Sequence, residues 1–259
     1  MTSIPTCAIA LALYATCAMA SAEITEPAAA ATPPAAAADI WHTSAELGAI
    51  TASGNTAGTS VTGKVDTRQE RNRWTNQYIA SGFFKEDVRR SGDTKTTVRT
   101  AKRVALSSKF AYRLDAENEK IFLLATHVED KFGAFTEYST VGVGHSSRWV
   151  QTPDKSVDVE LGPGYFNGER PNGDTESGLT LRGAAALKWQ LSAGAQFSQT
   201  VMVERGTSNV HSSAEAALST KINDTMQMKA AFVARNDSNV PDFKKNTDTQ
   251  TSVTLVYSF

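Results

Sequence analysis

The last nine residues of the chain, 251–259, alternate between apolar and polar side chains. Val253, Leu255, Tyr257 and Phe259 share one parity, whereas three of the four residues between Thr251 and Phe259 on the other parity are Ser or Thr. A period of two predicts a β-strand with one apolar face. That face ends on two aromatic residues, and barrels that span a bilayer place aromatic side chains at the membrane–water interface. The pattern therefore predicts the closing strand of an outer-membrane β-barrel.

The same alternation recurs in twelve segments, which are separated by short polar stretches rich in Gly, Asn and Asp. Leu179 and Leu181, for example, face one way and Arg182 the other. Twelve is an even number, as in bacterial single-chain barrels, so both termini should lie on one side. The fold class predicted is all-β, a transmembrane antiparallel up-and-down β-barrel of about twelve strands. The segments are 41–52, 59–69, 74–88, 95–112, 119–130, 136–149, 156–166, 177–191, 193–205, 209–222, 225–236 and 248–259.

The connections that follow even-numbered strands are generally shorter than those that follow odd-numbered strands. Residues 89–94 and 167–176 are among the longer ones, and 237–247 is the longest. Short turns are typical of the periplasmic side of such barrels. We therefore expect both termini, and the N-terminal tail, to lie in the periplasm.

Aromatic residues concentrate at strand ends that this topology puts on the periplasmic side, and each has the apolar parity of its strand. A soluble β-sandwich or a lipocalin-like barrel, which is the alternative fold, would gather its aromatic residues in the core instead. The arrangement favours an interface girdle. The girdle is predicted to consist of Trp41, Trp74, Tyr112, Trp149, Trp189, Tyr257 and Phe259.

The opposite parity carries charged residues of both signs. They could form cross-strand ion pairs, or line a channel that selects ions or solutes. Eight strands are filled by their side chains and sixteen leave a wide channel, so a narrow channel and a plugged lumen both stay open for twelve. The candidate lumen-lining residues are Glu46, Lys64, Asp66, Arg68, Arg99, Arg103, Asp158, Glu160, Arg182, Lys188, Glu204, Glu215, Lys229 and Arg235.

The N-terminal 40 residues differ in composition from the rest. Residues 1–22 are uncharged and apolar with small residues at the end, which predicts a secretory signal peptide, and the Ala/Pro-rich residues 23–40 predict a periplasmic linker. The barrel is then residues 41–259. Cleavage would remove Cys7 and Cys17, the only cysteines. The net charge of −1 shows no footprint for nucleic acid, which we exclude as a partner.

Sites for chemistry are sparse. The four histidines form no metal-ligand cluster, and the glycine-rich pieces are followed by no helix that would make a phosphate-binding loop. We predict no catalytic, cofactor-binding or metal-binding residues, and no enzyme activity. Two alternatives to a channel remain: an adhesive barrel whose loop 237–247 binds a partner, and an outer-membrane lipid hydrolase that uses His145 or His211.

Several short motifs carry a family resemblance. They are Gly54-Asn55-Thr56, Val141-Gly-Val-Gly144, Glu160-Leu-Gly-Pro-Gly-Tyr165, Gly168-Glu169-Arg170 and the C-terminal Val-Tyr-Ser-Phe. In order and spacing the chain resembles the YdiY-like putative salt-induced outer membrane proteins over about residues 41–259. The resemblance implies a barrel of undefined function with a link to salt or osmotic stress, and no catalytic residues. Expected partners are outer-membrane lipids and the barrel-assembly machinery, whose usual signal prefers glycine where Thr254 stands.

Overall fold

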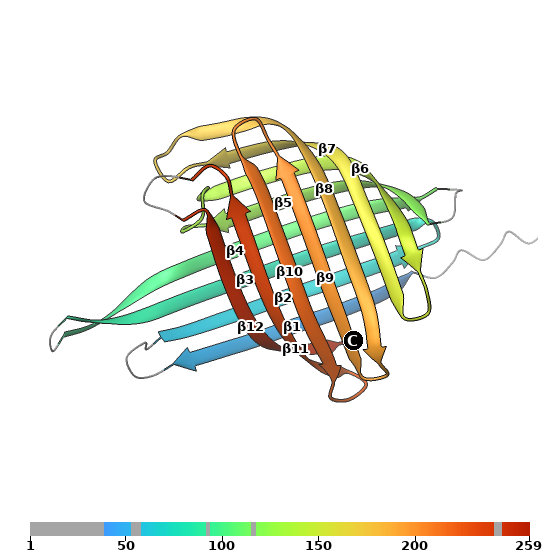
Figure 1. Cartoon of the computed structure of the whole chain (residues 1–259), viewed down its shortest axis with the longest axis horizontal. Coiled ribbons are helices and arrows are strands. Elements are labelled where there is room, and N and C mark those ends of the chain that lie inside the picture. The colour runs from blue at the N-terminus through green and yellow to red at the C-terminus, as the bar shows by residue number, and fades with distance from the viewer. Residues whose placement is uncertain (1–38, 53–57, 92–93, 115–117, 241–244) are drawn as a thin grey trace, which may run out of the picture. The chain divides into compact units, whose positions relative to one another are not determined.

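The chain forms a closed antiparallel β-barrel in a computed structural model (Figure 1). The structure describes residues 39–52, 58–91, 94–114, 118–240 and 245–259. The predicted signal peptide, most of the linker, the Gly54-Asn55-Thr56 motif and the loop residues Asp242, Phe243 and Lys244 lie outside these ranges. No helix in the described ranges is long and apolar enough to cross a membrane.

Twelve strands follow one another along the chain, as the alternation predicts. Each observed boundary lies within three residues of the predicted one. The strands are β1 (Ile40–Ala52), β2 (Gly58–Arg71), β3 (Trp74–Ser91), β4 (Thr94–Arg113), β5 (Glu119–Asp130), β6 (Glu137–Gln151), β7 (Lys155–Glu169), β8 (Thr175–Ser192), β9 (Ala195–Arg205), β10 (Val210–Lys221), β11 (Met226–Asp237) and β12 (Thr247–Ser258).

Each strand pairs with its sequence neighbours, and β1 pairs with β12 to close the barrel. We call the end where β1 begins and β12 ends the terminal rim, and the opposite end the loop rim. Tight turns join the strands at the terminal rim, and one of them contains Asn72 with a φ of 49°. Asparagine tolerates this left-handed conformation, which suits a two-residue turn.

The seam between β1 and β12 is short. Only four residue pairs are in register, from Ser44↔Ser258 to Leu47↔Leu255, whereas β1 and β2 pair along the whole of β1. The buried Thr254 fits at this seam because Gly48 lies opposite. A Cβ atom on Gly48 would come within 2.8 Å of the Thr254 methyl group. The threonine that replaces the expected glycine is thus matched by a glycine across the seam.

One local expectation was wrong. Residues 89–94 were predicted as a loop, but β3 and β4 continue pairing as a long ribbon to Ser91↔Thr94. A proline within a strand often marks a bulge, yet β7 keeps its register with both neighbours around Pro163. The register shifts lie elsewhere, beside Glu86 on β3, between Arg148 and Val150 on β6, and between Gln190 and Ser192 on β8.

Contacts between non-neighbouring strands identify the inner face, because such contacts can pass only through the interior. Lys109 of β4 bonds Glu160 of β7, and the rings of Tyr138 on β6 and His211 on β10 lie 6.4 Å apart. Residues of the opposite parity on these strands and their neighbours point outward. Leu161 and Leu179, for example, are 59% and 76% exposed. The barrel therefore has an apolar outer surface and a polar interior, as a bilayer requires.

Candidate functional site

The interior of the barrel holds nearly all the charged residues predicted for it. Cross-strand registers continue the inner parity from strand to strand, for example Asp158↔Ala186 and Arg182↔Glu204. The residues on this face are Glu46, Lys64, Asp66, Arg68, Arg103, Asp158, Glu160, Arg182, Lys188, Glu204, Glu215, Lys229 and Arg235. Whether they line a conducting path stays a prediction.

Arg99 is the exception, and its assignment to the inner face was wrong. The register shift between β3 and β4 places Arg99 opposite Glu86, the outward residue after the inward Lys85. Its guanidinium donates to the Glu86 carboxylate at 2.8 Å, and the Arg99 side chain is 54% exposed. A bulge adds one residue to a strand, which reverses the parity beyond it.

A salt-bridge network crosses the middle of the interior. The Lys109 ammonium bonds one oxygen of the Glu160 carboxylate, and Arg182 donates to the other at 3.1 Å. We call these three residues the central network. Lys109 also lies 4.5 Å from the centre of the Phe122 ring, a cation–π contact.

The glycine motifs make room for Phe122. A Cβ atom on Gly144 would come within 2.5 Å of the Phe122 ring, and one on Gly162 within 2.0 Å of the Val143 carbonyl oxygen. Glycine at position 144 therefore lets the bulky ring lie against the wall, and glycine at position 162 lets β7 approach the backbone of β6 closely. The Val141–Gly144 and Leu161–Gly164 motifs thus support the central network.

A second network strengthens the seam from inside. Lys229 of β11 reaches Glu46 of β1 at 3.3 Å and Glu215 of β10 at 3.2 Å. Lys64 of β2 lies 3.9 Å from the same Glu46. Because the network passes over β12, it joins strands on both sides of the short seam.

Arg103 and Asp130 organise the loop rim. The Arg103 guanidinium donates to Asp130 at 2.9 Å and to the Tyr138 hydroxyl at 3.3 Å. Both partners of the ion pair are 18% exposed. The other Asp130 carboxylate oxygen accepts the backbone N–H groups of Phe132 and Gly133, at 3.2 and 3.0 Å. One carboxylate therefore ties β4 to the loop that joins β5 and β6.

That loop folds over the interior and buries Phe135, which is 5% exposed. The Phe135 ring packs edge-on against Phe166 at 4.9 Å, and the Arg170 guanidinium lies 4.7 Å from its centre. We call Phe135, Tyr138, Phe166, Arg170 and His211 the loop-rim cluster. Its side chains, mostly aromatic, come from β6, β7 and β10 and from the connections that follow β5 and β7, and they narrow the interior at this end.

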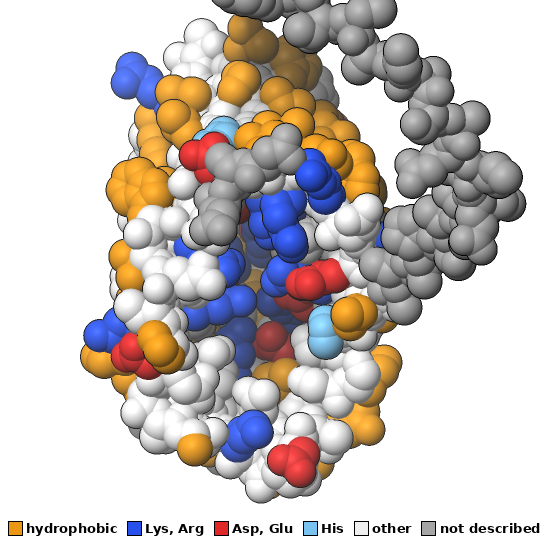
Figure 2. Space-filling model, turned by 90° about the vertical axis from the view of Figure 1, so that its right-hand side faces the viewer, with side chains coloured by type: hydrophobic (Ala, Val, Ile, Leu, Met, Phe, Trp, Pro, Cys, Tyr) orange, Lys and Arg blue, Asp and Glu red, His pale blue; other side chains and the backbone are white. Residues whose placement is uncertain are grey.

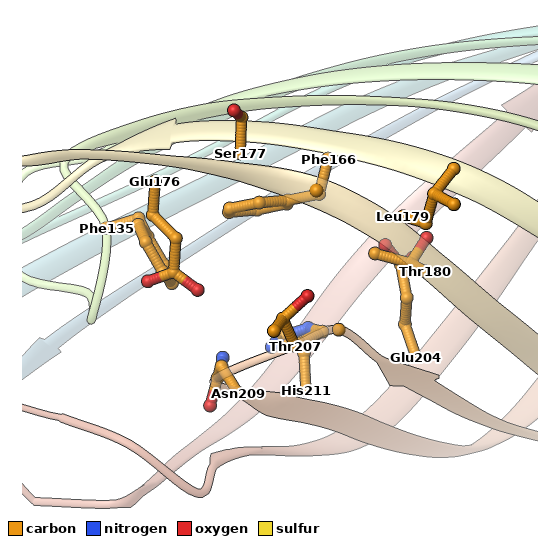
Figure 3. Close-up of a pocket in the computed structure, with 12 residues that line it drawn as sticks. Phe135, Phe166, Glu176, Ser177, Leu179, Thr180, Glu204, Thr207, Asn209 and His211 are labelled. Atoms are coloured by element: carbon orange, nitrogen blue, oxygen red, sulfur yellow. The ribbon is translucent and has the colours of Figure 1, made fainter.

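A small pocket adjoins the loop-rim cluster. Figure 3 shows Phe135 and Glu176 on one side of it and Asn209 and His211 on the other. His211 Nδ1 lies 3.0 Å from the Asp237 carboxylate, which also accepts from the Asn209 amide at 2.7 Å. The cavity measures about 40 Å³, room for a few water molecules rather than for an organic solute.

The inner face near the terminal rim has a different character. Arg68, Arg113, Lys120 and Arg148 converge there from four strands, and we call them the cation cluster. Figure 2 looks at this side and shows Lys and Arg side chains crowding the hollow, with fewer carboxylates between them. Arg148 pairs with Asp158 at 2.7 Å and Arg68 with Glu70 at 2.7 Å. In the described part of the chain, Lys120 and Arg113 form no ion pair.

The predicted girdle residues all lie near the terminal rim. Trp74 stands opposite Tyr112 with ring centres 5.1 Å apart, and Tyr257 and Phe259 lie 5.7 Å apart. Trp149 occupies the irregularity in β6 and is 72% exposed. Trp41 near the start of β1 and Trp189 near the end of β8 belong to the same rim. Their role as a membrane-interface girdle stays a prediction.

Two histidines lie on the outer face and have carboxylate neighbours. His145, which fits an apolar surface badly, is 3.5 Å from Glu119. His127 Nδ1 is 2.9 Å from the Ser139 hydroxyl on the neighbouring strand β6. Glu137 is 3.9 Å from His127 Nε2, too far for a hydrogen bond. This geometry offers little support for a hydrolase.

Sequence reasoning missed several inner-face residues that the structure makes central. Lys109 has inner parity in the sequence, yet only its distant partner Glu160 reveals its place. Lys120 and Arg148 sit near strand ends, where parity is hardest to assign. Phe135 lies in a connection, for which alternation gives no signal.

Comparison with known proteins agrees with this architecture. A family model described as "Protein of unknown function, DUF481" matches residues 45–259. The chain belongs to the DUF481 family. The uncharacterized protein YdiY of Escherichia coli K12 is 24% identical over 226 residues, which cover 87% of this chain and 86% of YdiY. The resemblance to the YdiY-like proteins, drawn from the short motifs, is therefore confirmed.

Solved structures show the same fold. The NanC porin superposes with a TM-score of 0.52 at 10% identity, covering 84% of this chain and 98% of NanC. An outer membrane channel of Pseudomonas putida F1 gives 0.51 at 12% identity, covering 91% of this chain and all of that one. Family and fold together identify this chain as a DUF481 member with the closed β-barrel fold that these outer-membrane proteins share.

Proposed function

We propose that the protein is a narrow channel of the outer membrane. The observation that carries the proposal is the polar, charged interior of the barrel. Only eight apolar side chains are buried among the described residues, and three of them are alanines on the inner face. A charged lining is what a path for hydrated solutes needs.

The proposed path is narrow for two reasons. The central network reaches from β4 to β7 through the middle of the interior. The loop-rim cluster buries Phe135 across the end of the barrel at the loop rim. Twelve strands give a lumen between that of filled eight-stranded barrels and wide sixteen-stranded porins. We therefore propose passage of ions and small solutes, with the loop-rim cluster as the narrowest point.

The orientation belongs to the same proposal. The terminal rim carries the short turns, which are typical of the periplasmic side. We place the predicted N-terminal tail there, and the loop rim outside the cell. The proposed link to salt or osmotic stress predicts that the amount of protein changes with medium osmolarity, which quantitative immunoblotting measures.

The two similar structures are a porin and an outer membrane channel, which favours transport. Planar bilayer recording of the purified, folded protein tests it. We expect discrete conductance steps smaller than those of sixteen-stranded porins, and a larger step after Phe135→Ala. The matched control is Phe132→Ala, which removes an exposed ring from the same loop. Silence of both the native protein and the Phe135→Ala variant at every voltage would overturn the channel.

A further inference from the structure

The cation cluster gathers positive charge from strands that are not all neighbours. Arg113 and Lys120 face each other across β4 and β5, and Lys120 stands opposite Ser146, two residues before Arg148 on β6. The Arg148 amide donates to the Asn118 carbonyl at 3.0 Å, which holds β6 against the start of β5. The fourth cation, Arg68, comes from β2 and interacts with Lys120 across the interior.

Negative charge nearby does not balance these four cations. Arg68, Arg113 and Arg148 all act on Lys120 with like charge, and Asp158 is the one carboxylate among its leading electrostatic neighbours. Asp158 itself is engaged with Arg148 through both oxygens, at 2.7 and 3.2 Å. The turn residues Asp115 and Glu117 fall outside the described part of the chain. Among the described residues, Lys120 and Arg113 therefore have no ion-pair partner, and the nearest compensating carboxylate is shared with Arg148.

A second observation, an unpartnered hydrogen-bond donor on Arg68, also indicates that the cluster lacks an acceptor. The Arg68 side chain pairs with Glu70, yet its Nε atom is buried and has no hydrogen-bond partner among the described residues. A buried donor without an acceptor costs free energy, about 1–3 kcal/mol. Converging like charges also destabilise the folded barrel. Both features disappear when an anion with several oxygens occupies the cluster, since it supplies counter-charge and acceptors together.

We propose that the cation cluster is a binding site for compact oxyanions with two or more negative charges, such as phosphates or polycarboxylates. Arg113 and Lys120 supply the uncompensated charge. Arg68 and Arg148, which are partly neutralised by Glu70 and Asp158, flank the site on β2 and β6. If the barrel is the proposed channel, the site makes it prefer anions, so this consequence rests on the proposed function, whereas binding itself does not.

Calorimetric titration of the folded protein in a zwitterionic detergent with inorganic pyrophosphate tests the site. The double variant Arg113→Gln/Lys120→Gln removes two positive charges from positions that hold no ion pair in the described structure. We expect it to bind pyrophosphate at least about tenfold more weakly than the native protein. The matched control, Lys102→Gln/Lys131→Gln, removes two charges from outside the cluster and should bind as the native protein does. Heat-modifiable gel mobility verifies that each variant is folded.

Three results would overturn the site: no pyrophosphate binding by the native protein, equal binding by all three proteins, or equal weakening in the control variant. The single variant Lys120→Gln replaces the double variant if the latter does not fold. Loss of binding in the cluster variant together with silent bilayers would retain the site and reject the channel. Conductance with an unchanged chloride-to-potassium permeability ratio in the cluster variant would reject the anion preference.

Discussion

The charges at the two ends of the barrel interior are paired to different degrees. Near the loop rim, Arg103 is paired with Asp130 and His211 lies within hydrogen-bond distance of Asp237, while the nearby Arg235 forms no ion pair among the described residues. Near the terminal rim, Arg113 and Lys120 face each other with no ion pair in the described structure. The same strands, β4 and β5, contribute to both ends. The difference therefore reflects the side chains at each level rather than a difference in backbone architecture.

The Arg103–Asp130 pair at the loop rim stabilises the fold of the connection between β5 and β6. Asp130 accepts bonds both from Arg103 and from the loop that carries Phe135, so breaking the pair should loosen the loop. Unpaired like charges repel one another, and strongly perturbed ionisable groups cluster at functional sites. The comparison separates charges that hold the barrel from charges that we propose act on solutes.

Replacing Arg103 by Gln should have the largest effect on stability. It leaves the poorly exposed Asp130 carboxylate without its cation, at a cost of about 3 kcal/mol. The free energy of unfolding, measured by urea titration in lipid vesicles, reports the loss. The variant Arg103→Gln/Asp130→Asn should recover part of it, and a single variant as stable as the native protein would show that the loop-rim pair is not structural.

Phe135→Ala should have the second largest effect on stability. It empties the space against Phe166 and removes the contact with Arg170, at about 2 kcal/mol because a loop relaxes more than a core does. The same urea titration measures it. An unchanged free energy of unfolding in Phe135→Ala would mean that the loop-rim cluster does not hold the loop over the interior.

Glu46→Gln should cost less, about 1 kcal/mol, since Lys229 keeps Glu215 as a partner. Because Glu46 supports the short seam, the loss should appear as faster unfolding during heating, followed by the gel-mobility shift. Asp66→Gln, which touches Lys64 on the same wall but not the seam, is the comparison variant. Equal rates of unfolding in the two variants would remove the special role of the seam network.

Lys120→Gln should have the smallest effect on stability, within about 0.5 kcal/mol of the native value or slightly stabilising, because it relieves repulsion. Urea titration at low ionic strength gives the clearest comparison, since salt screens the repulsion. A loss as large as that of Arg103→Gln would mean that the two ends of the interior do not differ as described.

Alternation predicted the barrel well because membrane strands expose one face to lipid and the other to water. That constraint reaches every residue of a strand, so β8 and β12 could be assigned face by face. It fails where a bulge changes parity, as at Arg99, and where a connection folds inward, as at Phe135. The pairing of Lys109 with Glu160 joins strands three apart, and no local pattern encodes which side chains meet across a lumen.

The zero-current potential of single channels in a potassium chloride gradient tests the central claim most directly, that uncompensated positive charge at the terminal rim governs what passes. The native protein should pass chloride in preference to potassium, and Arg113→Gln/Lys120→Gln should lower that permeability ratio about two- to threefold. A channel that prefers potassium, or whose selectivity ignores the two substitutions, would contradict the claim.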